Sequence, residues 1–562
     1  MVATRPFCTG GGAKRVGLPG RILLCSAAVW LFSAAHAHAI TCNVRTGPKS
    51  PADIAMSEHD YAKAESLYAA ESEAATGQPG SEADRLHAGL IRAELRQSKT
   101  ADAEKDAIAW STARPKNSWA LVALGEVQWR EGEVNDTLQT LNSVRRLDYC
   151  NPQAHADLAT IYRMSAMYAS ANSELTLARK LDPIDDQIER DWLRLQPRAD
   201  QLSELTRYLD HAAFLPDDER RSLERRKERL SEPPASGCRL VTPVASTAIP
   251  FRAILNSRNS HTYWGLDVEF NGKHRALEID TGASGLILTH SAANALHLTP
   301  DFHFKAGGIG DDGDVDSFVA KVASIKIGSL EFQDCDVEVL SKTPEGMLDQ
   351  DGLIGGDVFS HFLFTLDFPG RILKLDPLPA RPGDTSASST ASLETGVSTE
   401  ADAPQDAYRD ASMKDWDRVF RSGHQLIMPV QLKQNSPWKL FILDTGSQMD
   451  LISPDAAREV SKVSKGSWVN ITGISGEVKK TWTTGPMTLY FSHLAAPNNG
   501  MLSIDTSRLG KETGVEISGF IGAPTLHQLT MSIDYRDNLV HFTYDPKRIR
   551  RCMGNINIPD CY

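Results

Sequence analysis

The sequence lacks any excess of basic residues. Among its 562 residues, Lys and Arg number 60 and Asp and Glu number 72, which gives a formal net charge of -12 at pH 7. Nucleic-acid binding requires a basic surface that displaces counterions from phosphates, so we expect no nucleic-acid partner. The chain also lacks C-x-x-C and H-E-x-x-H pairs. A zinc site is therefore not indicated, and we expect neither a metal nor a cofactor.

Long apolar runs are absent after residue 39. The run Ile22–Ala35 follows several basic residues and precedes Ala37-His38-Ala39, which is the order of a signal peptide. An uncleaved anchor is the alternative, but the run is shorter than the roughly 20 residues that cross a bilayer. We predict a signal peptide over residues 1–39, cleaved after Ala39, and a secreted or periplasmic chain with no membrane segment after cleavage.

Cysteine is scarce. Two of the eight cysteines, Cys8 and Cys25, lie in the predicted signal peptide, and six remain: Cys42, Cys150, Cys238, Cys335, Cys552 and Cys561. An even number in an oxidising compartment favours disulfides, and the sequence does not choose among the many pairings. The pairing of Cys552 with Cys561, which closes a short loop, is the first candidate.

An apolar pattern of helical period lies within a predicted helical domain, 40–232. Small and apolar residues recur at a spacing of 34 residues, which resembles the tetratricopeptide repeat. One set comprises Leu158, Ala159, Tyr162, Ala171, Leu175, Ala178 and Pro183, and the set before it comprises Leu124, Gly125, Gln128, Thr137, Leu141 and Val144. From 184 the pattern continues as charged helix. The array either offers a surface to a protein partner or is a structural spacer, and the sequence leaves both readings open.

Alternating β-branched residues with Gly turns begin near residue 241. The segment W-G-L-D-V-E-F-N-G-K-H-R-A-L-E-I-D predicts two strands about an Asn271-Gly272 turn. The same strand, turn, strand pattern restarts after residues 379–412, a stretch without large apolar residues that predicts a flexible linker. We therefore expect two related β lobes, 241–378 and 413–552, and a C-terminal tail, 553–562.

Each β lobe contains the tripeptide D-T-G after an apolar strand, at Asp280-Thr281-Gly282 and at Asp444-Thr445-Gly446. Each also contains a later apolar-apolar-Gly segment, G-L-I-G-G-D-V-F in the first lobe and S-G-F-I-G-A-P-T-L in the second. Gly355 follows Asp280 by 75 residues, and Gly522 follows Asp444 by 78. The matched order and spacing indicate an internal duplication with one acid at an equivalent point of each copy.

These four motifs resemble the retropepsin-like and pepsin-like aspartic peptidases. The resemblance implies a multidomain chain, an all-α helical repeat array followed by two all-β acid-protease lobes. It also implies an aspartic-type endopeptidase, with Asp280 and Asp444 as catalysts and Thr281 and Thr445 as supporting residues. Two carboxylates a few ångströms apart share one proton, so one acts as general base on a water while the other polarises the scissile carbonyl. The partner so implied is a peptide or protein substrate.

Two finer expectations concern the surroundings of the acids. Ala283 follows the first motif and Ser447 follows the second. A Ser447 hydroxyl that donates to the carboxylate lowers its pKa, which makes Asp444 the more acidic member; the alternative is a turn residue bonded to nearby backbone. Glycine-containing segments that resemble the substrate-covering flaps of the family contain Gly308 and Gly310 in the first lobe and Gly473 and Gly476 in the second.

The sequence leaves two other functions open. In one, each lobe forms a separate homodimeric site. In the other, the β region is a non-catalytic peptide-binding scaffold. A single site within the chain is favoured over two homodimeric ones because a tether raises the effective concentration of one lobe for the other.

Overall fold

The computed structural model describes residues 41–75, 82–212, 214–231, 238–242, 245–255, 261–343, 350–382, 405–466 and 469–548. The chain divides into two compact units, Met1–Cys42 and Asn43–Tyr562, and the helices and strands below belong to the second. The predicted signal peptide, most of the predicted linker, the predicted tail and the Cys552–Cys561 pairing lie outside the described residues. Among the described helices, none has the length and apolar character needed to cross a bilayer.

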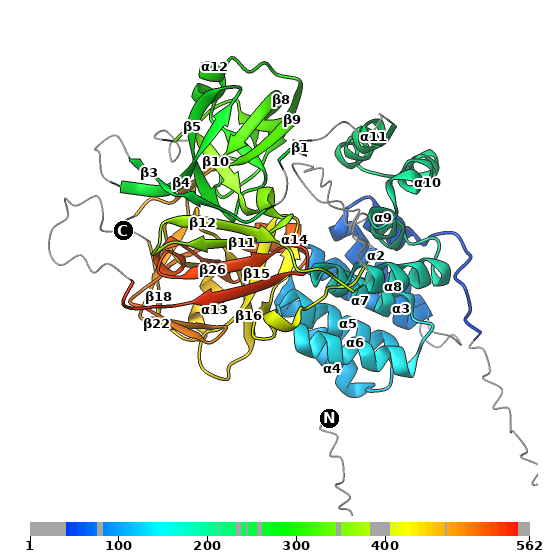
Figure 1. Ribbon diagram of the computed structural model, residues 1–562. Coiled ribbons are helices and arrows are strands. Elements are labelled where there is room, and N and C mark those ends of the chain that lie inside the picture. Colours follow the sequence, from blue (N-terminus) through cyan, green and yellow to red (C-terminus); the bar gives the residue numbers. More distant parts are fainter. Residues whose placement is uncertain are drawn as a thin grey trace, which may run out of the picture. The chain divides into compact units, whose positions relative to one another are not determined.

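The first part of the second unit is helical (Figure 1). Its helices are α1 (Pro51–Ser57), α2 (Tyr61–Ala74), α3 (Glu82–Arg96), α4 (Thr100–Ala113), α5 (Ser118–Arg130), α6 (Val134–Leu147), α7 (Pro152–Met164), α8 (Tyr168–Leu181), α9 (Asp186–Arg194), α10 (Arg198–His211) and α11 (Asp217–Ser231). Successive even-numbered helices α4, α6 and α8 begin 34 residues apart. A Cβ on Gly125 of α5 would lie 2.9 Å from the Leu141 side chain of α6, so a small residue is needed for this helix pair to pack closely.

Side-chain caps and prolines fix where these helices begin. Asn117, Asn151 and Asp185 accept backbone N–H groups at the starts of α5, α7 and α9, which satisfies donors that the first helical turn leaves unpaired. The segment from 184, expected to continue as charged helix, is helical and is divided into α9, α10 and α11. Pro197 and Pro216 precede the last two of these helices, and proline cannot donate the backbone bond that would continue a helix.

The first β lobe is built on one nine-stranded sheet. Its strands are β1 (Arg239–Leu240), β3 (Arg252–Leu255), β4 (His261–Phe270), β5 (Lys273–Asp280), β6 (Leu286–Leu288), β7 (Phe302–Ala306), β8 (Val315–Ile327), β9 (Leu330–Leu340) and β10 (Gly352–Gly355). The order is β1-β9-β6-β10-β5-β4-β8-β7, β3 pairs with β4, and a further β8–β9 pairing closes the sheet on itself. Helix α12 (His290–Leu296) and the 3-10 turn η2 (Gly356–Phe359) complete the lobe.

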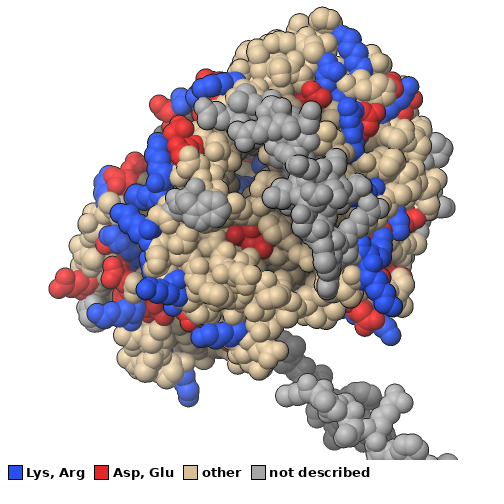
Figure 2. Space-filling view, turned by 90° about the vertical axis from the view of Figure 1, so that its left-hand side faces the viewer, with Lys and Arg blue, Asp and Glu red and all other residues tan. Residues whose placement is uncertain are grey.

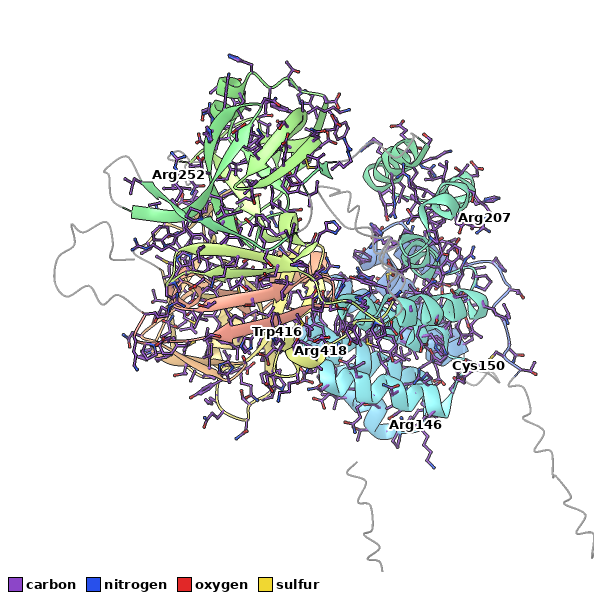
Figure 3. The ribbon with its side chains drawn as sticks, viewed as in Figure 1. Arg146, Cys150, Arg207, Arg252, Trp416 and Arg418 are labelled. Atoms are coloured by element: carbon purple, nitrogen blue, oxygen red, sulfur yellow. A yellow bond between two sulfur atoms is a disulfide. The ribbon has the colours of Figure 1, made fainter. Side chains whose placement is uncertain are left out.

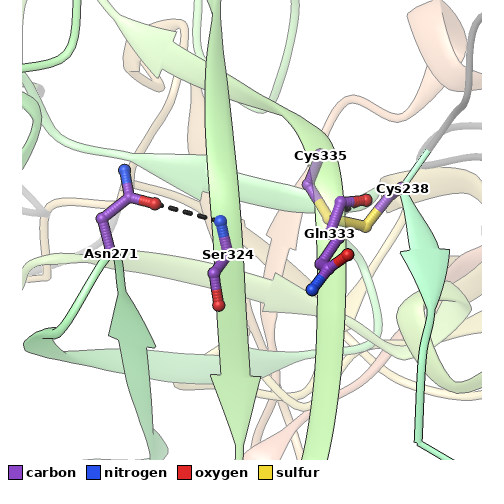
Figure 4. Close-up of a disulfide and its surroundings, with 5 residues drawn as sticks. All are labelled: Cys238, Asn271, Ser324, Gln333 and Cys335. Carbon is purple, nitrogen blue, oxygen red and sulfur yellow. Dashed lines mark hydrogen bonds between the residues drawn. A yellow bond between two sulfur atoms is a disulfide. The ribbon is translucent and has the colours of Figure 1, made fainter.

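A disulfide joins Cys238, directly before β1, to Cys335 on β9 (Figure 4). In the same view the Asn271 side chain, at the turn between β4 and β5, accepts a hydrogen bond of 3.0 Å from the backbone N–H of Ser324. Cys42 and Cys150 are also disulfide-bonded; Figure 3 labels Cys150 among the helices.

The second β lobe repeats the plan of the first with a ten-stranded sheet, in the order β18-β21-β24-β17-β25-β16-β15-β22-β23 with β14 on β15. Its strands are β14 (Phe420–Ser422), β15 (Gln425–Gln431), β16 (Trp438–Leu443), β17 (Leu451–Ile452), β18 (Val463–Lys465), β21 (Thr481–Thr484), β22 (Met487–Phe491), β23 (Leu494–Asn498), β24 (Leu502–Ile504) and β25 (Gly519–Ile521). A separate hairpin joins β19 (Thr472–Gly473) to β20 (Gly476–Glu477), and the helices are α13 (Pro454–Arg458), α14 (Ser507–Thr513) and α15 (Ala523–Leu526). Strands β16 and β25 run parallel, as β5 and β10 do.

A third sheet takes strands from both lobes. It consists of β13 (Asp417–Arg418), β27 (Leu539–Thr543), β26 (Thr530–Asp534), β11 (Phe362–Asp367), β12 (Ile372–Pro377) and β2 (Thr247–Pro250), in that order. The lobes meet where β11 pairs with β26, and the hydroxyls of Thr365 and Ser532 lie 2.7 Å apart across that pair. Figure 1 shows these two strands side by side, and Figure 3 labels Trp416 and Arg418 at the β13 end, where the Trp416 ring stacks on His541.

The helical array also shares core with the second lobe. One hydrophobic cluster contains Leu141, Leu158 and Ile161 of the array together with Leu440 and Phe520 of the lobe. Hydrogen bonds also join the two parts. The Asn538 side chain donates to the Met164 carbonyl at 2.9 Å, and the Glu516 N–H donates to the Arg130 carbonyl at 2.8 Å. The predicted order of a helical array followed by two β lobes is thus confirmed.

Candidate active site

The two D-T-G segments occupy equivalent loops. Asp280 is the last residue of β5 and Asp444 directly follows β16. In each lobe the strand of the apolar-apolar-Gly segment lies parallel to the strand that precedes the acid, so that Gly355 is opposite Asp280 and Ile521 is opposite Leu443. The sequence folds this way because apolar residues on both sides of the acid form buried strands, which leaves the D-T-G tripeptide to make the turn.

Both predicted supporting threonines are buried and bridge the two lobes. The hydroxyl of Thr281 donates to the Leu443 carbonyl at 2.7 Å and accepts from the Thr445 N–H at 3.1 Å. The hydroxyl of Thr445 donates to the Ile279 carbonyl at 2.8 Å and accepts from the Thr281 N–H at 3.0 Å. Four reciprocal hydrogen bonds therefore fix one loop against the other, and each hydroxyl both donates and accepts across the lobe interface.

This arrangement brings Asp280 and Asp444 together within one chain. Their carboxyls are partly buried and lie next to each other, each close to the glycine of the other motif. Gly282 N–H donates to Asp280 at 2.8 Å, and Gly446 N–H donates to Asp444 at 3.0 Å. A Cβ on either glycine would come within 3 Å of the other lobe's carboxyl, so the glycines are required for the two acids to approach.

Burial raises the pKa of both carboxyls, and the nearby charge of Asp280 raises that of Asp444 further. At Asp280 the Gly282 N–H, the bond from Asp444 and the charge of His424 act in the opposite direction and lower the pKa. Since two adjacent carboxylates cannot both ionise, they hold one proton as a pair. The pKa of Asp444 is raised well above its usual range, and the charge of Asp280 is one of the causes.

The premise of the expectation about Asp444, a Ser447 hydroxyl that donates to its carboxylate, is wrong. The Ser447 hydroxyl donates to the Met449 carbonyl at 2.8 Å rather than to the carboxylate. Only the backbone N–H of Ser447 reaches Asp444, at 2.9 Å. Ser447 supports the acid through its main chain, and its side chain stabilises the turn, as a serine bonded to nearby backbone does.

Three further residues of the site were not among the predicted site residues. Asp357 accepts the Ser284 hydroxyl at 2.9 Å and the Gly285 N–H at 2.8 Å, and Asp450 accepts the Gly522 N–H and the Thr525 hydroxyl, each at 2.8 Å. Each aspartate thus ties its D-T-G loop to its apolar-apolar-Gly segment. The third residue is His424, whose Nε2 donates to the Gly282 carbonyl at 2.9 Å. The two aspartates occupy different positions of the duplicated pattern, Asp357 in the apolar-apolar-Gly segment and Asp450 shortly after the D-T-G tripeptide, so duplication does not mark them, and nothing local marks His424.

The predicted flap segments of the two lobes meet each other. The Gly308 N–H donates to the Ser475 hydroxyl at 3.0 Å, and the Ser475 N–H donates to the Ile309 carbonyl at 2.9 Å. Gly310 approaches the Ser475 backbone so closely that an added Cβ would lie 2.3 Å from it. Gly473 and Gly476 are in similarly close contact with Ile309 and Asp312. All four predicted flap glycines thus lie at one junction between the lobes.

The flap junction also reaches the first D-T-G loop. Ile474 packs against a small apolar cluster that contains Ala283, Ile287, Ala306, Leu340 and Leu353. Figure 2 shows acidic side-chain atoms in a recess on one face of the molecule. The described residues therefore provide two adjacent acids on loops that are fixed to each other. They also provide two flap segments that contact each other and, through Ile474, the cluster that contains Ala283.

Comparison with known proteins matches part of this assembly. A family model described as aspartyl protease matches residues 266–358, a stretch that runs from β4 to η2 and includes Asp280 and Gly355. A search of curated proteins found no match. Among solved structures, the crystal structure of the aspartic proteinase from Irpex lacteus is similar, with 12% sequence identity, coverage of 54% of this chain and 98% of that chain, and a TM-score of 0.33. The first lobe is thus similar in sequence to aspartyl proteases.

Proposed function

We propose that this chain is an aspartic-type endopeptidase that hydrolyses peptide bonds with a water activated by Asp280 and Asp444. The observation that carries the proposal is the pair of adjacent carboxyls, one from each lobe, held by the reciprocal Thr281 and Thr445 contacts. The aspartyl protease match over residues 266–358 supports the same reaction class.

Because burial and the charge of Asp280 raise the pKa of Asp444 well above its usual range, we assign the shared proton to Asp444. Asp280, the charged member, takes a proton from the attacking water as general base. Asp444, the protonated member, donates a hydrogen bond to the scissile carbonyl and stabilises the charge that develops on its oxygen. The roles exchange when the tetrahedral intermediate collapses, and the proton from the water passes to the leaving amine. The joined flap segments cover the peptide and exclude bulk water from the pair.

Single replacements test this proposal against its two rivals. Asp280→Asn and Asp444→Asn keep the shape of each side chain and remove its charge, and each variant is assayed on a mixture of peptides. One shared site predicts that either change abolishes cleavage, while two separate homodimeric sites predict that each variant keeps part of it. A peptide-binding scaffold predicts no cleavage by the parent. Circular dichroism of each variant controls for folding.

We also propose that the enzyme acts in the periplasm or outside the cell, after removal of residues 1–39. The Cys238–Cys335 disulfide supports this location, because disulfides persist in oxidising compartments. N-terminal sequencing of the exported protein tests it, and the expected first residue is Ile40.

The helices are proposed to be tetratricopeptide-like repeats, with a protein partner on the faces that the second lobe does not cover. The 34-residue recurrence of α4, α6 and α8 supports this proposal. Crosslinking of the exported protein in cells tests it, and the expected result is a partner attached to the array.

A further inference from the structure

A third acid lies beside the catalytic pair. Glu278 precedes Asp280 by two residues on β5, so both side chains point to the same face of the strand. Leu277 and Ile279, which alternate with them, belong to the main core. Glu278 is only 4% exposed, and burial together with the charges of Asp280 and Asp444 raises its pKa well above the usual range.

Apolar side chains surround Glu278 on this face of the sheet. Glu278 is opposite Leu353 on β10, and Leu353 is opposite Ile287 on β6, so the three side chains form one row. Leu353 and Ile287 belong to the small cluster against which the flap residue Ile474 packs. Glu278 therefore lies at the end of an aliphatic wall that extends toward the flap junction, on the side of the sheet that carries Asp280.

One neighbour of Glu278 is a buried amide with a free acceptor. The Gln350 side chain is close enough to Glu278 to lower its pKa as a hydrogen-bond donor and is 7% exposed, yet among the described residues its Oε1 has no hydrogen-bond partner. No residue of the described part of the chain forms an ion pair with Glu278. Among the described residues, a buried acid without a cationic partner thus lies beside an amide oxygen without a donor, and a buried acceptor without a donor costs free energy until a donor arrives.

We infer that Glu278 and Gln350 form a subsite for a Lys or Arg side chain of the substrate, next to the scissile bond. This inference rests on the proposed peptidase function and names its substrate class. A basic side chain fits both parts of the subsite: its methylene stem covers the aliphatic wall, and its cationic end donates to the two acceptors. The cation also compensates the buried charge of Glu278, which favours the ionised carboxylate.

Two peptides that differ at one position test the subsite. One has Lys next to the cleaved bond and the other has norleucine, which keeps the stem and removes the charge. The parent is expected to favour the Lys peptide by at least about tenfold in kcat/KM, because a site built to bind a polar group discriminates strongly against an analogue that lacks it. In Glu278→Gln this ratio falls by about tenfold because KM for the Lys peptide rises. Glu278→Leu is expected to favour the norleucine peptide.

Glu338 provides a matched control. It continues the row beyond Ile287, which places it three strands, or roughly 14 Å, from Glu278, and burial raises its pKa to about 7. Glu338→Gln is expected to keep the parent's ratio. Thermal unfolding of all variants separates a loss of fold from a loss of selectivity.

The outcomes distinguish this inference from the proposed function. A parent that cleaves neither peptide contradicts the peptidase proposal itself. A parent that cleaves the norleucine peptide as well as the Lys peptide overturns only the subsite, and this comparison holds even where the variants do not fold. Equal loss of both activities in Glu278→Gln, with the ratio unchanged, also overturns it, because Glu278 then acts on the catalytic pair and not on the substrate side chain.

Discussion

At the scale of single residues, the two lobes differ in what surrounds each catalytic carboxyl. Asp444 accepts two backbone N–H groups, from Gly446 and Ser447, yet retains the higher pKa because it lies beside the charged Asp280. His424 is close enough to lower the pKa of Asp280. The sequence predicted a role for the Ser447 hydroxyl, but rotation about a single side-chain bond decides whether it points to the carboxylate or to the Met449 carbonyl, and no motif encodes that choice.

Ser447→Ala is therefore expected to leave the acid limb of the pH–kcat/KM profile unmoved. The lost bond to the Met449 carbonyl costs about 1 kcal/mol of unfolding free energy and does not change the charges near Asp280. His424→Asn is the informative comparison. Loss of the histidine charge raises the pKa of Asp280, so the carboxylate is protonated at a higher pH and the acid limb moves upward. A limb that moves in Ser447→Ala and stays in His424→Asn contradicts this assignment.

At the scale of elements, the parts that the sequence predicted are those set by local pattern. The strands about Asn271-Gly272 and the loops after β5 and β16 follow from apolar alternation and turn residues close together in the chain. The pairing of β11 with β26 and the junction of the flap segments join residues far apart in sequence. Their strands are short and their apolar content is ordinary, so pairing depends on the lobes being held together, which only the folded chain provides.

The flap junction predicts that Gly310→Ala is more harmful than its neighbour Gly313→Ala. Both glycines have positive φ, +130° and +90°, so both changes introduce backbone strain of about 1 to 2 kcal/mol. An added Cβ at 310 also meets the Ser475 backbone at 2.3 Å, while nothing lies within 4 Å of one at 313. Gly310→Ala should separate the two flap segments and lower kcat/KM by roughly 10- to 100-fold.

Peptide cleavage and thermal unfolding, measured on both variants, check this expectation. Gly313→Ala should show the strain as a lower melting temperature while keeping most of its activity. Similar activity in the two variants would mean that contact between the flap segments is not needed for cleavage.

At the scale of the whole molecule, the helical array is part of the structure of the second lobe. The sequence identified Leu141 and Leu158 as core positions of a repeat, which they are, but the same side chains belong to a cluster that extends to Leu440 and Phe520 of the lobe. The repeat pattern encodes only which residues are buried. Whether they are buried by a neighbouring repeat or by another domain depends on contacts between segments hundreds of residues apart.

Ile161→Ala tests whether the array and the lobe unfold together. Ile161 is 2% exposed and belongs to the shared cluster, so its truncation should cost about 2 to 5 kcal/mol and destabilise both parts. Ile91→Ala is the matched control, because Ile91 is fully buried in a cluster made of array residues alone. We expect Ile161→Ala to lower the midpoint of heat inactivation of peptide cleavage together with the midpoint seen by far-UV circular dichroism. Ile91→Ala should lower mainly the latter. Equal effects of the two variants on heat inactivation would instead indicate that the whole array, and not the shared cluster, supports the lobe.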